Sequence, residues 1–329
     1  MFDKEFYNGK RVLVTGADGF MGSHLTERLL EMGAEVSIFV RGSSTLGAAK
    51  VQLKNLAHVQ DKFDKSHLIA GNLGNPESVG LIVKHKPQII FHLAAEAYVN
   101  KSFEQPFEVI NANSIGTVNI LEASRKLHEM GVLERTVNTS SSEVYGPYPT
   151  PIKEDFILNG TSPYAASKIA ADRFGYAWYV TWGIPIATIR PFNTYGPRMI
   201  YDVTPRFIRF ALEGKPLTIY GDGTQTRDLS YVSDTVNGFL VMGSHEKAIG
   251  EFVNFGTSVD VSINELAEKI IKISGSSSEI THIEQRLAEV SRLCCDNTKA
   301  KELFGWKPQV SIDEGLKLNI EWEREKTGN

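Results

Sequence analysis

The stretch R-V-L-V-T-G-A-D-G-F-M-G, residues 11–22, decides the fold of this chain. An apolar run leads into three glycines, Gly16, Gly19 and Gly22, and the next segment has the apolar spacing of a helix. Glycines let the backbone approach a phosphate, and the start of a helix offers free N–H groups and a positive partial charge. Between a first strand and a first helix, this stretch therefore predicts a phosphate-binding turn.

The same alternation of apolar runs and helical patterns continues through the first half of the chain. Further strands are expected at residues 35–40, 67–72, 88–95, 135–140 and 185–193. Helices are expected at residues 20–33, 106–128 and 162–182. Strands that alternate with helices are typical of parallel βαβ units, so the predicted fold class is α/β, with a doubly wound parallel sheet of the Rossmann type. In that setting the glycine turn indicates a bound dinucleotide.

The pattern changes after about Phe192. Turn-rich segments surround short helices that are expected at residues 204–214, 262–275 and 296–308. We therefore expect a dinucleotide-binding domain over residues 1–191 and a smaller α+β substrate-binding region over residues 192–329, with segments near 230–255 returning to the sheet. Ligands of open α/β sheets bind at the carboxyl ends of the strands, so the second region would enclose a substrate there.

Composition argues against several classes of function. The 329 residues carry a net charge of −4 without a run of like charges, which argues against a nucleic-acid binder. The chain begins without a secretory signal, and no segment offers the ~20 apolar residues that span a bilayer. The two cysteines, Cys294 and Cys295, are adjacent, and no histidine has the spacing of a metal site. We therefore expect a cytoplasmic protein with no membrane, nucleic-acid or metal partner.

The end of the second expected strand indicates which dinucleotide binds. A site for NAD usually has an acidic residue there, which holds the 2′-hydroxyl of the ribose. This chain instead has Arg41 and Ser43 in the sequence F-V-R-G-S-S. Because arginine binds phosphate through a rigid fork, these residues favour the 2′-phosphate of NADP over NAD.

A tyrosine and a lysine four residues apart, Tyr164 and Lys168, share one face of the helix expected to begin after Ser162. An ammonium group beside a phenol favours the phenolate, so we expect Lys168 to lower the pKa of Tyr164 below about 10. Such a tyrosine can remove a hydroxyl proton while hydride passes to a nicotinamide. The preceding strand ends in S-S-S-E, which places Ser141 near this pair.

Six motifs occur in the order of a known family. They are T-G-A-D-G-F-M-G (15–22), H-L-A-A (92–95), N-S-I-G-T (113–117), S-S-S-E-V-Y-G (140–146), Y-A-A-S-K (164–168) and R-P-F-N-T-Y-G-P-R (190–198). The chain resembles the extended short-chain dehydrogenase/reductase family that acts on nucleotide sugars. The resemblance covers almost the whole length, because T-R-D-L-S-Y-V-S-D-T-V and the closing D-N-T-K-A-K-E-L-F-G-W also fit.

The resemblance implies a role for each matching residue. Tyr164 would be the base for the C4 hydroxyl of the sugar, Lys168 would hold the nicotinamide ribose, and Ser141 would bond the same oxygen. Beside Arg41 and Ser43, it assigns cofactor binding to Gly16, Gly19, Phe20, Met21, Gly22, Asn72, Leu73, Leu93, Ala94, Ala95, Asn113, Tyr164, Lys168 and Pro191. It assigns substrate binding to Asn193, Arg206, Arg227, Arg286 and Arg292. The chain has G-N-L-G-N at 71–75 where the family usually has G-D-x-x-D, but the amide oxygen of Asn72 can still accept a hydrogen bond.

Glu143 distinguishes the reactions of this family. Simple 4-epimerases usually lack a carboxylate at its position, because oxidation and reduction at C4 need only the tyrosine and the serine. A base there could remove the C5 proton of a 4-keto sugar, which predicts a 4,6-dehydratase with NADP or NAD retained and recycled. Ser142 occupies the position where thymidine-sugar dehydratases carry an aspartic acid, so Ser142 or a water would assist the leaving hydroxyl.

Other functions stay open. A 4-epimerase is one alternative, and a UDP-glucuronate decarboxylase is another, since those enzymes have a similar Ser-Glu pair and an arginine near the position of Arg292. A dinucleotide sensor is a third, although relatives of that kind tend to lose the tyrosine or the lysine. The helices at 106–128 and 162–182 match the pair that forms a dimeric four-helix bundle in the family, so we expect a homodimer.

Overall fold

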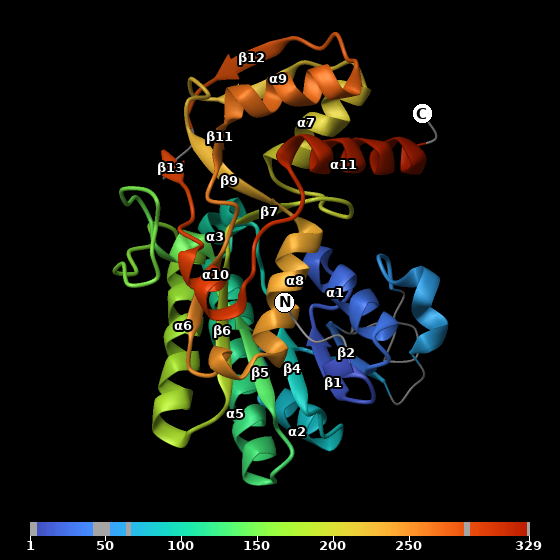
Figure 1. Ribbon diagram of the computed structural model, residues 1–329, viewed down its shortest axis with the longest axis vertical. Coiled ribbons are helices and arrows are strands. Elements are labelled where there is room, and N and C mark those ends of the chain that lie inside the picture. Colours follow the sequence, from blue (N-terminus) through green and yellow to red (C-terminus); the bar gives the residue numbers. More distant parts are fainter. Residues whose placement is uncertain (1–4, 42–52, 64–66, 286–289, 328–329) are drawn as a thin grey trace.

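The computed structural model describes residues 5–41, 53–63, 67–285 and 290–327 (Figure 1). Its centre is a seven-stranded sheet with the strand order β10-β6-β5-β4-β1-β2-β3. The strands are β1 (Arg11–Thr15), β2 (Glu35–Arg41), β3 (Leu68–Gly71), β4 (Ile89–His92), β5 (Arg135–Thr139), β6 (Ile186–Pro191) and β10 (Phe252–Phe255). Every pairing in this sheet is parallel, which confirms the predicted fold class.

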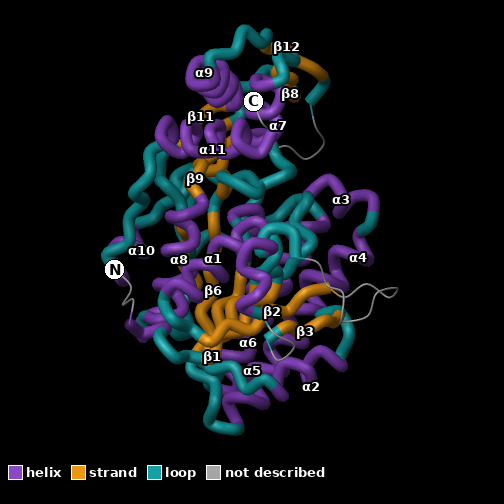
Figure 2. Tube along the Cα trace, turned by 90° about the vertical axis from the view of Figure 1, so that its right-hand side faces the viewer, coloured by secondary structure: helices purple, strands orange, loops and turns teal. Residues whose placement is uncertain are grey.

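Helices cover both faces of this sheet. The helices that cover the sheet are α1 (Phe20–Glu31), α2 (Glu77–Lys84), α5 (Gly116–Glu129), α6 (Pro163–Trp182) and α8 (Val232–Ser244). Figure 2 shows α2, α5 and α6 on one side of the sheet and α1 and α8 on the other. The helix α8 and the edge strand β10 lie in the segment that was expected to return to the sheet. The division of the chain into two domains at residue 191 stays a prediction.

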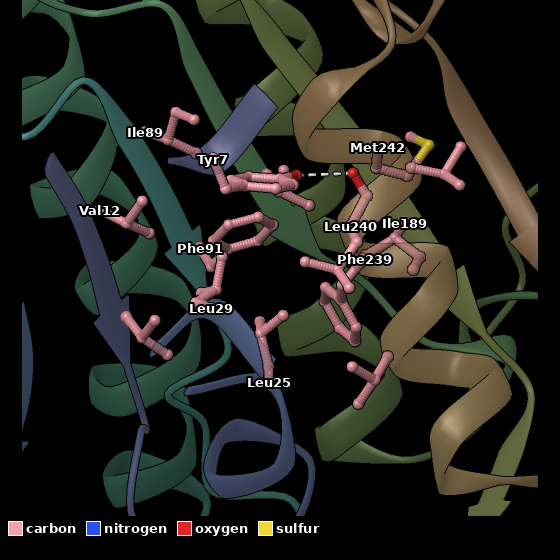
Figure 3. Packing of buried hydrophobic residues seen from close by; sticks show 14 of the residues in the cluster. Tyr7, Val12, Leu25, Leu29, Ile89, Phe91, Ile189, Phe239, Leu240 and Met242 are labelled. Atoms are coloured by element: carbon pink, nitrogen blue, oxygen red, sulfur yellow. Dashed lines mark hydrogen bonds between the residues drawn. The ribbon is translucent and has the colours of Figure 1, made fainter. Parts of the chain in front are cut away.

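Apolar side chains from α1, α8 and the sheet form a core on one face (Figure 3). Tyr7, from a short 3-10 turn (Glu5–Tyr7), lies fully buried in it and donates a hydrogen bond of 2.6 Å to the carbonyl of Leu240. Phe91 of β4 and Phe239 of α8 are also fully buried. The burial of these aromatic groups fixes α8 against the sheet, since apolar burial is the main stabilising contribution in a fold.

The helix expected at 106–128 is interrupted. It consists of α4 (Pro106–Ile110), a π-helical turn η4 (Asn111–Ile115) and α5, and it is preceded by α3 (Val99–Glu104). A π turn holds one extra residue and is often found beside functional sites. Its effect here is local: Asn113 and Ser114 point into the protein and are buried.

Most of the second region lies above the sheet in Figure 1, whereas its helix α10 (Thr298–Phe304) contacts the edge strand β10. Its helices are α7 (Val203–Leu212), α9 (Ile263–Ser274), α10 (Thr298–Phe304) and α11 (Ile312–Thr327). Its strands are β7 (Asn193–Tyr195), β8 (Leu217–Tyr220), β9 (Thr226–Tyr231), β11 (Asp260–Ser262), β12 (Ile280–Ile283) and β13 (Arg292–Leu293). Elsewhere in the described chain, three further 3-10 turns are labelled η3 (Ala57–Lys62), η5 (Ser142–Val144) and η6 (Glu246–Ala248). Ser262 caps α9, because its hydroxyl accepts a hydrogen bond from the backbone N–H of Glu265.

In the described ranges no helix has the length and apolarity needed to cross a membrane. The same residues contain no group of three or more histidine, cysteine, aspartate or glutamate side chains suited to a metal ion.

Candidate active site

The carboxyl ends of β1, β2, β3 and β4 surround a cavity of about 470 Å³, here called the glycine-loop cavity. Eleven of the residues expected to bind a cofactor line it: Gly16, Gly19, Phe20, Met21, Gly22, Arg41, Asn72, Leu73, Leu93, Ala94 and Ala95. Ser43, expected beside Arg41, lies outside the described residues. Four distant segments of sequence thus meet at one edge of the sheet, where α/β folds bind their ligands.

The turn after β1 requires glycine. Gly16 has φ +69°, and a Cβ atom on it would lie 2.8 Å from the backbone nitrogen of Ala94. A Cβ atom on Gly22 would collide with the carbonyl oxygen of Gly16. Helix α1 starts here with Gly19 as its N-cap, and no side chain of the described residues bonds to the N–H groups of its first turn. These N–H groups are therefore available to bind an anion in the cavity. These features fit the pyrophosphate of a dinucleotide.

Arg41 ends β2 and lines the cavity with its side chain 63% exposed. It forms an ion pair with Glu108 of α4, with 3.5 Å between Nη1 and Oε1. Lys101 contacts Glu108 as well, and it also pairs with Glu96 on the cavity wall. Arg41 is therefore already engaged by a carboxylate at the position where a 2′-phosphate would bind.

Asn113 and Pro191 do not line the cavity. The Asn113 amide accepts from the Glu96 nitrogen at 2.7 Å and donates to the Glu96 carbonyl at 3.1 Å and to the Ser167 hydroxyl at 3.0 Å. Asn113 thus braces the segment after β4 against α6. Pro191 is the last residue of β6 and is paired with Phe255 of β10.

The start of α6 positions the expected catalytic pair. Ser162 is the N-cap, accepting from the Ala165 nitrogen at 3.0 Å, and a proline occupies the first turn. Tyr164 and Lys168 are buried one turn apart. The phenol of Tyr164 is hydrogen-bonded to Ser141, which follows β5, and the Ser141 hydroxyl also accepts from the Glu143 nitrogen at 3.2 Å. The predicted trio of Tyr164, Lys168 and Ser141 is therefore brought together.

The electrostatics of this trio differ from the expectation. Burial raises the pKa of Tyr164, the bond with Ser141 opposes that shift, and the nearby Glu143 and Tyr201 add to it. The prediction that Lys168 lowers this pKa is wrong for the structure, because burial dominates and the Lys168 ammonium donates to the Thr139 carbonyl at 2.7 Å. Burial also lowers the pKa of Lys168 to about 8, against the attraction of Asp172.

A buried ion pair holds α6 in place beneath these groups. Arg190 of β6 donates to both carboxylate oxygens of Asp172, at 2.8 Å and 3.0 Å, and also donates to the Tyr145 hydroxyl at 2.7 Å. Both Arg190 and Asp172 are almost wholly buried. The pair links β6, α6 and the segment after Ser141, and so fixes the relative positions of the catalytic groups.

A second cavity of about 480 Å³, here called the arginine cavity, lies between the sheet and the second region. Glu143 lines it together with three of the residues expected to bind substrate: Asn193, Arg206 and Arg227. Arg206 donates to the Thr218 carbonyl at 3.0 Å, and Arg227 donates to the Val290 carbonyl at 2.8 Å. Carbonyl contacts orient both guanidinium groups on a wall of the cavity, a geometry suited to a diphosphate.

Besides Asn113 and Pro191, five expected residues line neither cavity: Ser141, Ser142, Tyr164, Lys168 and Arg292. Ser142 is buried in the turn η5 and lines neither cavity. Arg292 on β13 also lines neither; its Nε lies 2.7 Å from Asp260, and this pair lowers the pKa of Asp260 to about 2. Arg286 lies outside the described residues. Neighbouring residues in a tight turn point in different directions, which is why Glu143 reaches the cavity and Ser142 does not.

The sequence analysis did not name several residues that line the arginine cavity, among them Tyr98, Phe103, Ile200, Tyr201 and Arg209. Arg209 lies three positions after Arg206 on α7, so the i, i+3 spacing of two arginines was a readable signal. Tyr98 and Tyr201 belong to no motif, and only the fold brings them together. Tyr201 and Ala97 line both cavities, which makes them the junction between the two.

Comparison with known proteins finds similar proteins over nearly the whole chain. The family model described as GDP-mannose 4,6 dehydratase matches residues 13–318. The chain is 35% identical over 323 residues to a UDP-glucose 4-epimerase of Mycolicibacterium smegmatis, covering 96% of this chain and 99% of that protein. It is also 35% identical over 335 residues to a UDP-N-acetyl-alpha-D-glucosaminuronate decarboxylase of Bacillus cytotoxicus, covering 96% and 98%.

Two solved structures are similar over nearly the whole chain. One is a UDP-glucose 4-epimerase with UDP-glucose from Thermotoga maritima, 29% identical, with a TM-score of 0.84 and coverage of 96% of this chain and 99% of that one. The other is a dTDP-glucose 4,6-dehydratase from Streptomyces venezuelae with NAD bound, 28% identical, with a TM-score of 0.85 and coverage of 97% and 98%.

Proposed function

The chain belongs to the GDP-mannose 4,6-dehydratase family, within the extended short-chain dehydrogenases/reductases that modify nucleotide sugars, and on that premise we propose that it is a nucleotide-sugar 4,6-dehydratase. One observation carries the proposal. Glu143 lines the arginine cavity two residues beyond Ser141, which is bonded to Tyr164. A carboxylate in that position has no task in a reaction confined to C4, but it is the base that removal of a C5 proton requires.

The first step belongs to the buried trio. A nicotinamide dinucleotide held in the glycine-loop cavity would supply the acceptor for the C4 hydride and later return that hydride to C6. Once its own proton has left, the Tyr164 phenolate takes the proton of the C4 hydroxyl, and Ser141 holds the same oxygen by a hydrogen bond. Lys168 carries a positive charge beside the developing oxyanion below about pH 8. General-base catalysis of this kind contributes about 10²–10⁴ in rate.

The second step belongs to Glu143. The C4 ketone makes the C5 proton acidic, and the Glu143 carboxylate removes it. The C6 hydroxyl then leaves as water while a double bond forms between C5 and C6. Because a serine, Ser142, stands where some dehydratases carry an aspartic acid, the leaving oxygen receives its proton from Glu143, which took one from C5. When the hydride returns to C6, C5 regains a proton, which balances the proton that Tyr164 took from the C4 hydroxyl. The reaction is therefore redox-neutral and removes one water.

We propose NAD as the cofactor. The ion pair between Arg41 and Glu108 favours this choice over the NADP expected from the sequence, because a 2′-phosphate would have to compete with the Glu108 carboxylate. The dTDP-glucose 4,6-dehydratase of similar structure was solved with NAD bound. A location in the cytoplasm stays a prediction.

A 4-epimerase is the alternative with a specific observation in its favour. Position 142 is a serine, so the site lacks the separate acid that some dehydratases use, and an epimerase needs only Tyr164 and Ser141. The decarboxylase alternative loses support, since Arg292 is engaged with Asp260 outside the cavity.

The test is mass spectrometry of the purified protein with UDP-, GDP-, dTDP- and CDP-hexoses and with UDP-glucuronate. A dehydratase removes one water from one of the hexoses. The Glu143→Gln variant should then accumulate the 4-keto hexose with reduced cofactor on the enzyme, and should release no dehydrated product. Unchanged mass with inversion at C4 in both proteins would establish the epimerase instead.

We further propose a homodimer through four helices. Large apolar side chains are exposed on two neighbouring helical segments: Phe107, Ile110 and Ile115 on α4 and η4, and Tyr176, Val180 and Trp182 on α6. The segments α4 and α6 contact each other. Exposed apolar side chains on neighbouring helices favour an interface, and a second copy that presents the same two segments would cover them.

A further inference from the structure

Four large apolar side chains form a rim on the arginine cavity. Tyr98, Phe103, Ile200 and Tyr201 line it and are 43%, 44%, 54% and 38% exposed. The rest of the lining is largely polar, with Glu143, the arginines and Asn193. Single exposed apolar residues are common on proteins, but a cluster of them on the wall of a cavity marks a surface that a ligand covers.

The two tyrosines of the rim meet across the cavity from separate parts of the chain. Tyr98 precedes α3, and Tyr201 lies between β7 and α7. Their ring centroids are 5.8 Å apart with an interplanar angle of 48°. The pair therefore joins the sheet to the second region at the entrance of the site.

The segment that carries Tyr201 is held firmly on both sides. Arg198 forms an ion pair of 2.8 Å with Glu27 of α1, and Asp202 caps α7 by accepting from the Val203 nitrogen at 2.7 Å. Both Arg198 and Asp202 have a positive φ, +73° and +96°. Non-glycine residues adopt this conformation only where the surrounding structure enforces it, which points to a constraint on the position of the ring.

The position of the rim relative to the two cavities indicates which part of a nucleotide sugar the rim would contact. Hydride transfer requires the sugar C4 to touch the nicotinamide, so the sugar must lie where the cavities meet. Ala97 and Tyr201 line both cavities and mark that junction. The diphosphate, with its negative charge, belongs on the wall that carries Arg206 and Arg227.

We propose that the rim of Tyr98, Phe103, Ile200 and Tyr201 grips the hexose of the bound nucleotide sugar, packing against the C–H face of the pyranose ring. The inference rests on the proposed nucleotide-sugar substrate but not on which reaction follows. The rim is then the part of the site that distinguishes a nucleotide sugar from the free nucleotide. Burial raises the pKa of Tyr201, so its ring is neutral and suited to apolar contact with the sugar.

The test compares the binding of a nucleotide with that of its sugar conjugate. Isothermal calorimetry on the protein would measure UDP, GDP, dTDP and CDP and the glucose conjugate of each. For the best-bound pair, the Tyr201→Ala and Tyr98→Ala variants should each lose about tenfold in affinity for the conjugate. Their affinity for the nucleotide alone should stay unchanged, because the diphosphate wall is intact.

Two controls separate this role from a structural one. Tyr201→Phe keeps the ring and should keep the ratio of the two affinities. Leu318→Ala shortens an exposed apolar side chain that lines neither cavity, and it should change neither affinity. Equal losses for nucleotide and conjugate in Tyr201→Ala and Tyr98→Ala, or no loss for either, would overturn the inference. A wild-type protein that binds none of the nucleotides or conjugates would overturn the proposed function and this inference with it.

Discussion

Arg41 at the end of β2 is held by Glu108 of α4, with 3.5 Å between guanidinium and carboxylate, on the wall of the glycine-loop cavity where we expect the adenosine ribose of a dinucleotide. A 2′-phosphate would have to displace this carboxylate, whereas a 2′-hydroxyl would not. The pair is partly exposed, so its free energy is only about 0.2–1 kcal/mol. Glu108→Gln should therefore raise the affinity for NADP by up to about fivefold and leave that for NAD nearly unchanged.

Fluorescence titration of the two dinucleotides would measure this change, and it needs no knowledge of the sugar substrate. The double variant Arg41→Gln/Glu108→Gln is the matched control, because without the guanidinium the gain for NADP should vanish. An equal gain in the double variant would mean that Glu108 acts on the cofactor by another route.

Lys168 gives the activity an alkaline limit. Burial lowers its pKa to about 8, so above that pH the ammonium beside Tyr164 is lost and oxidation at C4 should slow. A profile of kcat against pH should fall with an apparent pKa near 8. In Lys168→Arg the residual activity should lose this limb, since a guanidinium stays charged throughout the range.

The same lysine should leave a signature in stability. Its folded pKa lies below the unfolded value of about 10.4, so between pH 8 and pH 10 the unfolded chain binds more protons than the folded one. The contribution of Lys168 to the free energy of unfolding therefore rises from pH 8 to pH 10, because loss of its proton removes the cost of burying a charge. The free energy of unfolding in urea, wild type minus Lys168→Met, should increase from pH 8 to pH 10; a constant difference would argue against a buried ammonium.

Substitution by alanine should impair dinucleotide binding at Gly22 but stabilise the fold at Gly80. A Cβ atom on Gly22 collides with the Gly16 carbonyl, which would distort the turn after β1 and reduce dinucleotide affinity by at least about tenfold. Gly80 lies in the helix α2 with nothing within 4 Å of a Cβ atom. Gly80→Ala should bind dinucleotide normally and stabilise the fold by about 0.5–1 kcal/mol. Titration with NAD and urea unfolding of both variants check the pair.

Removing one partner of the buried pair Arg190 and Asp172 should lower the free energy of unfolding more than replacing both partners by apolar residues. Asp172→Asn leaves an uncompensated guanidinium in the interior and should cost about 3–5 kcal/mol in the free energy of unfolding. The double variant Asp172→Leu/Arg190→Met removes both charges and should cost less than Asp172→Asn alone. A double variant as unstable as the sum of its single changes would show that the two groups are not coupled.

The exposed face on α4 and α6 should control the oligomeric state. Phe107 is 87% exposed, so Phe107→Glu places a charge in the proposed interface without disturbing the interior. The wild type should sediment as a dimer and the variant as a monomer in analytical ultracentrifugation. Ile157→Ala, at a residue 75% exposed outside these helices, should remain dimeric. A monomeric wild type would refute the proposed dimer.

The motifs of the sequence predict the sheet and the base of the site well. The glycine turn, the capped helix with Tyr164 and Lys168, and the strand before Ser141 follow from local patterns that each need only a few neighbouring residues. Helix α11 was missed because many of its residues are charged and only a narrow stripe, including Leu316 and Ile320, is buried. Strands such as β13, with two residues, are too short to show alternation.

The finer features of the site could not be predicted, because they depend on the directions of side chains. Ser142 and Glu143 are adjacent in sequence, yet only Glu143 reaches the cavity, owing to the turn η5. The electrostatics of Tyr164 depend on how deeply the phenol is buried, which no spacing reveals. The tyrosine pair of the rim joins residues more than one hundred positions apart, and no local pattern predicts their meeting.

The π-helical turn at Asn111–Ile115 separates two halves of one long helix. Its extra residue offsets the downstream half by about 100° relative to an unbroken helix. The packing of α5 against the sheet and the outward orientation of α4 are thus set independently. The outer half carries both Phe107, which is exposed, and Glu108, which pairs with Arg41 on the wall of the glycine-loop cavity, so one short segment couples the proposed dimer surface to the proposed cofactor site.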